Sequence, residues 1–469
     1  MSNISSSLLD QCYHLVWGAP LLLLVTGLSL YYTIALKGLQ FRYLAYGLKL
    51  AFGKSQDAKS QGDISHFQSL MTALAATIGI GNIAGVATAI AAGGLGAIFW
   101  MWATALIGMS IKYAEAILAV KYRVTDKKNE MSGGPMYFIE RGLGWKSLAC
   151  AFAFFGSMAA LGGGNMLQAN SVADVMRGVF SVDPMWTAIV LAALTGLSIL
   201  GGIRSIGKIA SLLVPFMAVS YILGSSYVIL SCYEQIPHAI TSIFTHAFTG
   251  QAAFGGFLGA SVQQAIQMGV SRGLMTSEAG LGTASIAAAS AKTDTPGRQA
   301  LVSMTGSFLA TIIMCSMTAL VLGVTDAFGL LGANGKILNG ASMTVHAFNS
   351  VVPWGGYVVS VGLILFAFTT LLGWAYYGEK CVEYLFGVKS VPFYRIIFTV
   401  FVALGAVLEL EIVWKVSDIF NGLMAFPNLI GLMLLSKVVI AETKEFLALV
   451  ESEKKEKMAQ RRPVLEAKV

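Results

Sequence analysis

The sequence predicts an all-α integral membrane protein with about eleven transmembrane helices. Hydrophobic residues make up 56% of the 469-residue chain and charged residues 12%, whereas soluble proteins carry roughly 25% charged residues. The apolar residues gather in runs of the length that crosses a bilayer as a helix, roughly 20 residues. Two of these runs are interrupted near their centres by glycine and polar residues, which predicts a transporter architecture.

Eleven apolar runs give the expected spans. In chain order they cover residues 14–36, 66–92, 95–120, 147–178, 185–202, 207–232, 256–290, 297–323, 354–386, 393–409 and 412–437. Polar loops follow the first and the third run, and the charged tail after residue 451 is expected to form a solvated helix.

Lys and Arg are shared unevenly between the loops. Most lie in the loops after the first and third runs and beyond residue 437, while the opposite side has few, such as Arg177, Lys336 and Lys415. Cytoplasmic loops are enriched in Lys and Arg. We therefore expect a multi-pass protein of the cell (inner) membrane, with its N-terminus outside and its C-terminus in the cytoplasm. The net charge of +7 then reflects topology and contact with membrane lipid rather than nucleic-acid binding.

The second and seventh runs are poor continuous helices. The second has GIGN at residues 79–82, and the seventh has SRGLMTSEAGLG at residues 271–282. Glycine inside a helix costs about 1 kcal/mol relative to alanine, and unwound backbone at membrane depth is tolerated only when it is buried or lines a cavity. We interpret residues 79–82 and 271–278 as unwound, and Gly85 and Gly96 as sites of close helix packing.

The positions of the two broken runs predict an internal repeat. Without the first run, ten remain, and a broken run stands first in each set of five. Five spans per set give the two halves opposite topology, which is typical of inverted-repeat transporters with a site at the midplane. The expected regions are 1–62 (N-terminus, extra helix and cytoplasmic loop), 63–235 (first repeat), 236–437 (second repeat) and 438–469 (cytoplasmic tail).

An unwound segment suits two ligands at once. The free N–H groups and positive dipole end of the following half-helix favour a carboxylate. The carbonyl groups freed at the end of the preceding half-helix favour a hard cation such as sodium. An amino acid and a cation can therefore share one break.

Several motifs give the chain a resemblance to a known family. The stretch GGLGAIFWMWATALIG at residues 93–108 is close to the signature GGxGAxFWMW, with Ala103 where a larger aliphatic residue is expected. Supporting stretches are GIGNIAGVATAI, KYAEAILAVKYR, SGGPMYFIERGLG, RGLMTSEAGLGTA and FAFTTLLGWAYYGEK. Together they resemble the alanine or glycine:cation symporters over nearly the whole chain. The resemblance implies a LeuT-like fold, a 5+5 inverted repeat with one additional N-terminal helix.

The resemblance also implies a substrate site and a sodium site. The substrate residues would be Thr77, Gly79, Ile80, Gly81, Asn82, Gln168, Met275, Thr370 and Trp374. Sodium would be held by the backbone carbonyl groups of Ala75, Ile78 and Phe366 and by the hydroxyl groups of Thr369 and Thr370. For Gln168 the alternative is a polar contact between helices, and for Trp374 it is a packing or lipid-facing role. Met275 stands where many relatives carry Phe, which leaves the choice of substrate open.

Charged residues inside the spans suggest ion pairs. Lys112 and Glu115 lie three apart on one helical face, and Arg272 and Glu278 lie in the seventh run. Because charges at such depth are costly, we expect structural or gating ion pairs rather than direct substrate contacts.

The sequence thus predicts a symporter that imports a small neutral amino acid, alanine or glycine and including D-alanine, together with Na⁺. The nearest alternatives are a proton-coupled transporter using Glu278 and a family member tuned to glutamine. A channel is disfavoured because the two breaks are unlike each other. An enzyme is disfavoured because no HExxH, GxSxG or P-loop pattern occurs, and no organic cofactor is expected.

Overall fold

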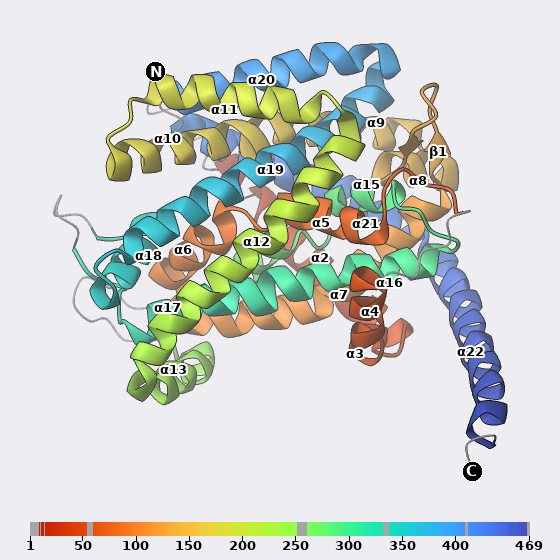
Figure 1. The fold of residues 1–469 in the computed structure, drawn as a ribbon, viewed down its shortest axis with the longest axis horizontal. Coiled ribbons are helices and arrows are strands. Elements are labelled where there is room, and N and C mark those ends of the chain that lie inside the picture. The colour runs from red at the N-terminus through yellow and green to blue at the C-terminus, as the bar shows by residue number, and fades with distance from the viewer. Residues whose placement is uncertain are drawn as a thin grey trace.

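A computed structural model of the chain is a bundle of long, steeply crossing helices, from which one C-terminal helix projects (Figure 1). It describes residues 9, 11–13, 15–53, 60–250, 260–331, 337–408 and 411–466, without the side chains of residues 411, 412, 414 and 457–466. The predicted start of the first span at residue 14, the start of the seventh at 256–259 and the end of the tenth at 409 lie outside the described residues.

The long elements of the first half follow the predicted spans closely, while three short α-helices lie in the predicted loops after the first and third runs. They are α2 (Ala19–Ala35), α3 (Leu39–Arg42), α4 (Leu44–Phe52), α5 (His66–Thr77), η1 (Ile80–Asn82), α6 (Ala84–Gly93), α7 (Gly96–Lys121), β1 (Val124–Thr125), β2 (Met131–Ser132), α8 (Pro135–Leu143), α9 (Lys146–Leu161), η2 (Gly162–Met166), α10 (Leu167–Phe180), α11 (Pro184–Ile199), α12 (Gly202–Ser231) and η3 (Tyr233–Gln235). The two strands form an antiparallel hairpin, with Val124 opposite Ser132 and Thr125 opposite Met131.

The second half also contains short helices outside the predicted spans. Its elements are α13 (Ile236–Thr249), α14 (Val262–Ser277), α15 (Thr283–Ala289), α16 (Pro296–Ser307), η4 (Phe308–Cys315), α17 (Ser316–Val324), α18 (Gly340–Val351), α19 (Gly355–Phe386), η5 (Val388–Ser390), α20 (Val391–Val407), α21 (Glu411–Leu434) and α22 (Ser436–Glu466). The charged tail is helical as expected, because it forms the outer part of α22.

Among the described residues, seven continuous helices are long and apolar enough to cross a membrane. The remaining spans are either shorter, as in α2 and α11, or divided, as in the two broken helices. The total of eleven therefore stays a prediction, while the all-helical membrane architecture is confirmed.

The two broken helices begin in the same way. Ser65 accepts a hydrogen bond from the Gln68 N–H at 3.1 Å, and the Gln68 side chain returns one to the Ser65 N–H. Ser261 and Gln264 form the same capping box at the start of α14. Each box satisfies backbone donors that a helix start leaves free. The Ser-x-x-Gln spacing occurs in the sequence at both places and indicates the two helix starts, which were not predicted from it.

Both predicted breaks are present, and one of them is shifted. The first lies between α5 and α6, where Ile78 and Gly79 are not helical. The second spans residues 278–282, because Glu278, Gly280 and Gly282 all have positive φ. Residues 271–277, predicted to be unwound, instead complete α14. Gly280 and Gly282 thus have the positive φ that unwinds the backbone, whereas Gly273, nearer the start of the segment, does not.

Candidate substrate and cation site

A cavity of about 220 Å³ lies where the two breaks meet the middle of α19. Eight of the nine predicted substrate residues line it, and they come from five elements of the bundle. These eight are Thr77, Gly79, Ile80, Gly81, Gln168, Met275, Thr370 and Trp374. Segments that are nearly 300 residues apart in the chain therefore bring the predicted residues to one place.

Asn82 is the exception, because it supports the break from behind. Its side chain is buried, and its Oδ1 accepts the Gly79 N–H at 3.1 Å while its Nδ2 donates to the Ala310 carbonyl at 3.0 Å. Its own N–H is bonded to the Gly79 carbonyl, so this donor is already used within the turn. The N–H groups of Ile80 and Gly81 precede that first bond of η1 and are not used within the turn, and both residues line the cavity.

A π-helical segment positions Gln168. Gly164 of η2 lets this segment approach α19 closely, since a Cβ added there would lie 2.4 Å from the Trp374 Cβ. The Gln168 Nε2 donates to the Gly163 carbonyl at 3.0 Å, within its own helix. Its Oε1 is buried and has no partner among the described residues. An unpartnered buried acceptor at a cavity is suited to a ligand that donates hydrogen bonds.

Trp374 and Met275 form part of the cavity wall. Trp374 is 6% exposed and packs its ring edge-to-face on Tyr377 at 5.8 Å, which fixes its orientation. It is therefore not lipid-facing. Met275 lies on α14 one residue before Thr276, and its sulfur accepts a weak contact from the Arg272 Nη1 at 3.4 Å.

Oxygen atoms from α5 and α19 meet beside the cavity. The Thr370 Oγ1 lies 3.1 Å from the Ala75 carbonyl and 2.9 Å from the Phe366 carbonyl, and the Thr369 Oγ1 lies 3.0 Å from the Phe366 carbonyl. A hydroxyl has one proton and can donate to only one of two acceptors. This group of uncharged oxygens, named here the Thr370 oxygen cluster (Ala75, Phe366, Thr369 and Thr370), is chemically suited to a hard cation.

Ile78, the remaining predicted sodium ligand, lies in the unwound pair that follows α5. It is 1% exposed, and the structure shows no hydrogen bond to its carbonyl group among the described residues. Gly79, its neighbour, approaches α19 so closely that an added Cβ would lie 2.6 Å from the Thr370 Oγ1. The break is thus in contact with the Thr370 oxygen cluster.

Gly85 and Gly96 differ from each other. A Cβ at Gly96 would lie 2.4 Å from the His246 backbone, which confirms close packing between α7 and α13. A Cβ at Gly85 would meet nothing within 4 Å, and Gly85 lines the cavity, so the packing interpretation is wrong there.

The expected ion pairs among the four charges inside the spans are not present. No ion pair within 4.0 Å joins Lys112, Glu115, Arg272 or Glu278 to another described residue. Instead, the Glu115 Oε1 accepts the Gly282 N–H at 3.1 Å and the Asn428 Nδ2 at 2.8 Å, which holds the second break against α7 and α21. Arg272 and Glu278 line the cavity.

Trp17, Thr276, Asp418 and Asn421 also line the cavity and were missed from the sequence. Asp418 and Asn421 are polar residues three apart inside an apolar run, a pattern that could have indicated a functional helix face. Trp17 had no comparable signal, because it precedes a helix outside the repeat.

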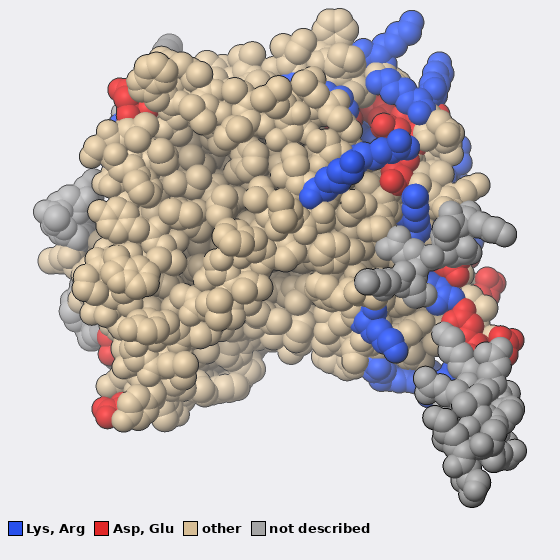
Figure 2. Space-filling model, in the orientation of Figure 1, with Lys and Arg blue, Asp and Glu red and all other residues tan. Residues whose placement is uncertain are grey.

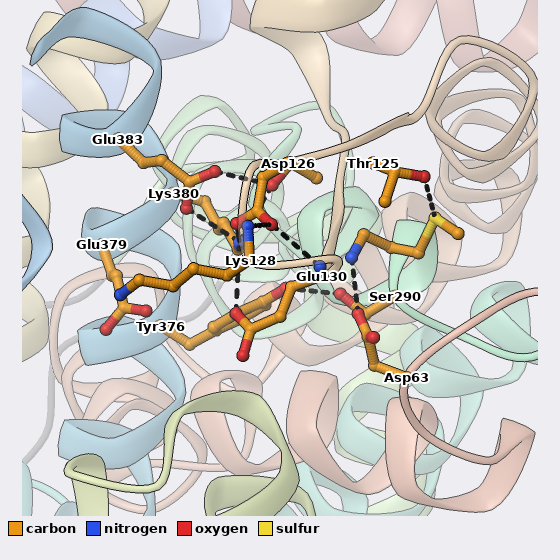
Figure 3. Close-up of polar contacts among 12 residues, drawn as sticks. Asp63, Thr125, Asp126, Lys128, Glu130, Ser290, Tyr376, Glu379, Lys380 and Glu383 are labelled. Atoms are coloured by element: carbon orange, nitrogen blue, oxygen red, sulfur yellow. Dashed lines mark hydrogen bonds and ion pairs between the residues drawn. The ribbon is translucent and has the colours of Figure 1, made fainter. Parts of the chain in front are cut away.

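A second polar cluster lies at the end of α19 (Figure 3). The Lys380 Nζ donates to the Glu383 Oε2 at 2.8 Å and to the Ser132 Oγ at 2.9 Å. It also lies 3.9 Å from carboxylate oxygens of Asp126 and Glu130 in the hairpin of β1 and β2. These five residues, named here the Lys380 cluster, fasten the hairpin to α19 through a lysine side chain that is 0% exposed.

The chain is similar to known transport proteins. A model described as the sodium:alanine symporter family matches residues 1–460. The chain is 53% identical to the sodium/alanine symporter AgcS of Methanococcus maripaludis, over 96% of this chain and 99% of that protein. It is 35% identical to the probable sodium/glutamine symporter GlnT of Bacillus subtilis, over 95% of this chain and 91% of that protein.

Solved structures share the fold at low sequence identity. MhsT in complex with L-phenylalanine superposes with a TM-score of 0.59 at 13% identity, covering 84% of this chain and 93% of that chain. The Eremococcus coleocola manganese transporter in complex with an aromatic bis-isothiourea substituted compound gives a TM-score of 0.52 at 12% identity, with 84% and 83% covered. The fold is therefore that of the LeuT-type transporters.

Proposed function

The chain belongs to the sodium:alanine symporter family, and on this premise we propose that it imports a small neutral amino acid, alanine or glycine, together with sodium. The protein is a multi-pass membrane transporter.

One observation carries the proposal: Thr370 belongs to both candidate sites. It lines the cavity, and its hydroxyl group contacts the Ala75 carbonyl of the broken helix. A cation in the Thr370 oxygen cluster would hold the end of α5 against α19. The adjacent turn would then present the N–H groups of Ile80 and Gly81 to a carboxylate. Binding of the ion would thus organise the substrate site.

One further polar atom of the cavity suits the ammonium group of an amino acid. The unpartnered Gln168 Oε1 is an acceptor that can receive a hydrogen bond from it. Trp374 and Met275 wall the cavity, and from these two bulky side chains we infer a preference for alanine or glycine over glutamine. Both enantiomers of alanine fit this description, because no described contact distinguishes them.

The charge distribution supports one orientation of the protein in the membrane. Figure 2 shows Lys and Arg gathered at the end of the molecule from which α22 projects, with few at the opposite end. By the positive-inside rule this end faces the cytoplasm, so that the N-terminus lies outside. The broken helices would then allow access from one side at a time, around a fixed site at mid-membrane.

Alanine uptake by the purified protein in proteoliposomes tests the proposal. We expect an inward sodium gradient alone to concentrate alanine, with the membrane potential clamped and the pH equal on both sides. Glycine should compete with alanine, and leucine should compete at least about tenfold less well. Uptake driven only by a proton gradient would overturn the sodium assignment. Stronger competition by glutamine than by glycine would overturn the substrate assignment.

A further inference from the structure

Trp17 lines the cavity although it belongs to a part of the chain outside the predicted repeats. It stands two residues before α2, the additional N-terminal helix. It is 3% exposed, and its indole N–H donates to the Asp418 carbonyl on α21 at 2.7 Å. The cavity wall is thus completed by a residue that the ten-helix architecture does not supply.

The additional helix is fastened along α21 at both of its ends. At one end is the bond from Trp17 to Asp418, and at the other the Tyr32 hydroxyl donates to the Leu432 carbonyl at 2.6 Å. The earlier residue of one helix contacts the earlier residue of the other, and the later contacts the later, so the two helices run parallel. The position of Trp17 relative to α21 is therefore fixed by hydrogen bonds at both ends of the additional helix.

A glycine on α21 makes room for this contact. A Cβ added at Gly422 would lie 2.2 Å from the Val16 Cγ1 and 3.1 Å from the Trp17 Nε1. The segment before α2 therefore approaches the α21 backbone directly, between Asp418 and the following turn. Close backbone approach of this kind, combined with a buried indole that has its donor satisfied, gives a rigid wall.

We propose that Trp17 is a specificity-determining residue, which limits the side-chain volume that the cavity accepts. This inference rests on the proposed function. The indole ring occupies the side of the cavity that α21 borders, while Trp374 and Met275 border it from α19 and α14. Removing the ring enlarges the cavity without touching the unwound turn or the Thr370 oxygen cluster. Larger amino acids then gain space, and small ones lose contacts.

Competition binding against labelled alanine at saturating sodium tests this role, using glycine, alanine, valine and leucine in wild type, Trp17→Ala and Trp17→Phe. For Trp17→Ala we expect the ratio of the leucine to the alanine inhibition constant to fall at least about tenfold, the range set by one or two methylene groups. Trp17→Phe keeps most of the ring and should shift the ratio less. Trp354, which is 62% exposed at the start of α19, provides the matched control, and Trp354→Ala should leave the ratio unchanged.

The outcomes separate this inference from the function on which it rests. If wild type binds no small amino acid in sodium, the proposed function fails. If wild type binds alanine and Trp17→Ala keeps the wild-type ratio, only the role of Trp17 fails, and its contribution is structural. Trp17→Leu replaces Trp17→Ala if the latter does not yield folded protein by size-exclusion chromatography, and an unchanged ratio in it contradicts the inference equally.

Discussion

The Thr370 oxygen cluster and the Lys380 cluster both gather oxygen atoms on α19, but they differ in charge. Around Lys380 there are three carboxylates within 4.0 Å, and the cation is a side chain that cannot leave. Around Thr370 the oxygens are carbonyl and hydroxyl groups without formal charge. A lysine ammonium group is covalently attached, so it can be held by several carboxylates. A transported ion must leave its site, so its ligands cannot bind it that strongly. We therefore propose that the Lys380 cluster has a structural role and that the Thr370 oxygen cluster binds and releases an ion.

The largest expected effect is on the Lys380 cluster. Lys380→Met removes the only described cation within 4.0 Å of Asp126, Glu130 and Glu383. It leaves the buried carboxylates of Asp126 and Glu383 without that partner. We expect the free energy of unfolding to fall by about 3–5 kcal/mol, measured by denaturant titration in detergent.

Lys121→Met is the matched control for that change. Lys121 pairs with Glu442 at the surface, where its side chain is 36% exposed. Loss of an exposed pair costs at most about 1 kcal/mol. Equal losses in the two variants would mean that the Lys380 cluster contributes no more than a surface ion pair.

The next effect concerns the contact between the break and α19. In Gly79→Ala the new Cβ would collide with the Thr370 Oγ1, at 2.6 Å, so that either the turn or the hydroxyl must move. We expect sodium-driven uptake to fall by at least about tenfold, a change of 1.4 kcal/mol, with normal insertion. Gly27→Ala on α2 has nothing within 4 Å of the new atom and should transport normally. Wild-type uptake by Gly79→Ala would exclude close contact at the break during transport.

A smaller effect separates the two threonines. Thr370 contacts α5 through the Ala75 carbonyl, whereas Thr369 contacts its own helix and the Met217 sulfur on α12. Thr369→Ala should therefore raise the sodium concentration for half-maximal uptake by less than Thr370→Ala does. A larger shift for Thr369→Ala, in uptake measured over a sodium series, would move the cation toward α12.

The sequence predicted the elements of the site better than their contacts. Glycines and polar residues inside apolar runs indicated both breaks, because such residues are unfavourable in a continuous helix at membrane depth unless the backbone is unwound around a cavity. The end of α14 was misplaced, since residues 271–277 satisfy helical geometry and the positive φ begins only at Glu278. The number of glycines in a segment does not indicate which of them has a positive φ.

Contacts between distant helices were beyond the reach of sequence patterns. Gly81 and Gly79 look alike in the motif GIGN, yet only Gly79 is crowded by α19, while a Cβ at Gly81 would have its nearest neighbour at 4.0 Å. Trp17 and the Lys380 cluster were missed for the same reason. Their partners lie hundreds of residues away, and hydrophobic periodicity does not specify which helix packs against which.

The half-maximal sodium concentration for alanine uptake in wild type, Thr370→Ser and Thr370→Ala tests the central claim most directly. Serine keeps the hydroxyl oxygen, and alanine removes it without adding bulk. We predict a sodium dependence close to wild type for Thr370→Ser and a half-maximal concentration raised at least about tenfold for Thr370→Ala, the loss of one ligand that organises the site. An unchanged sodium dependence in Thr370→Ala would contradict the assignment of the Thr370 oxygen cluster as the cation site.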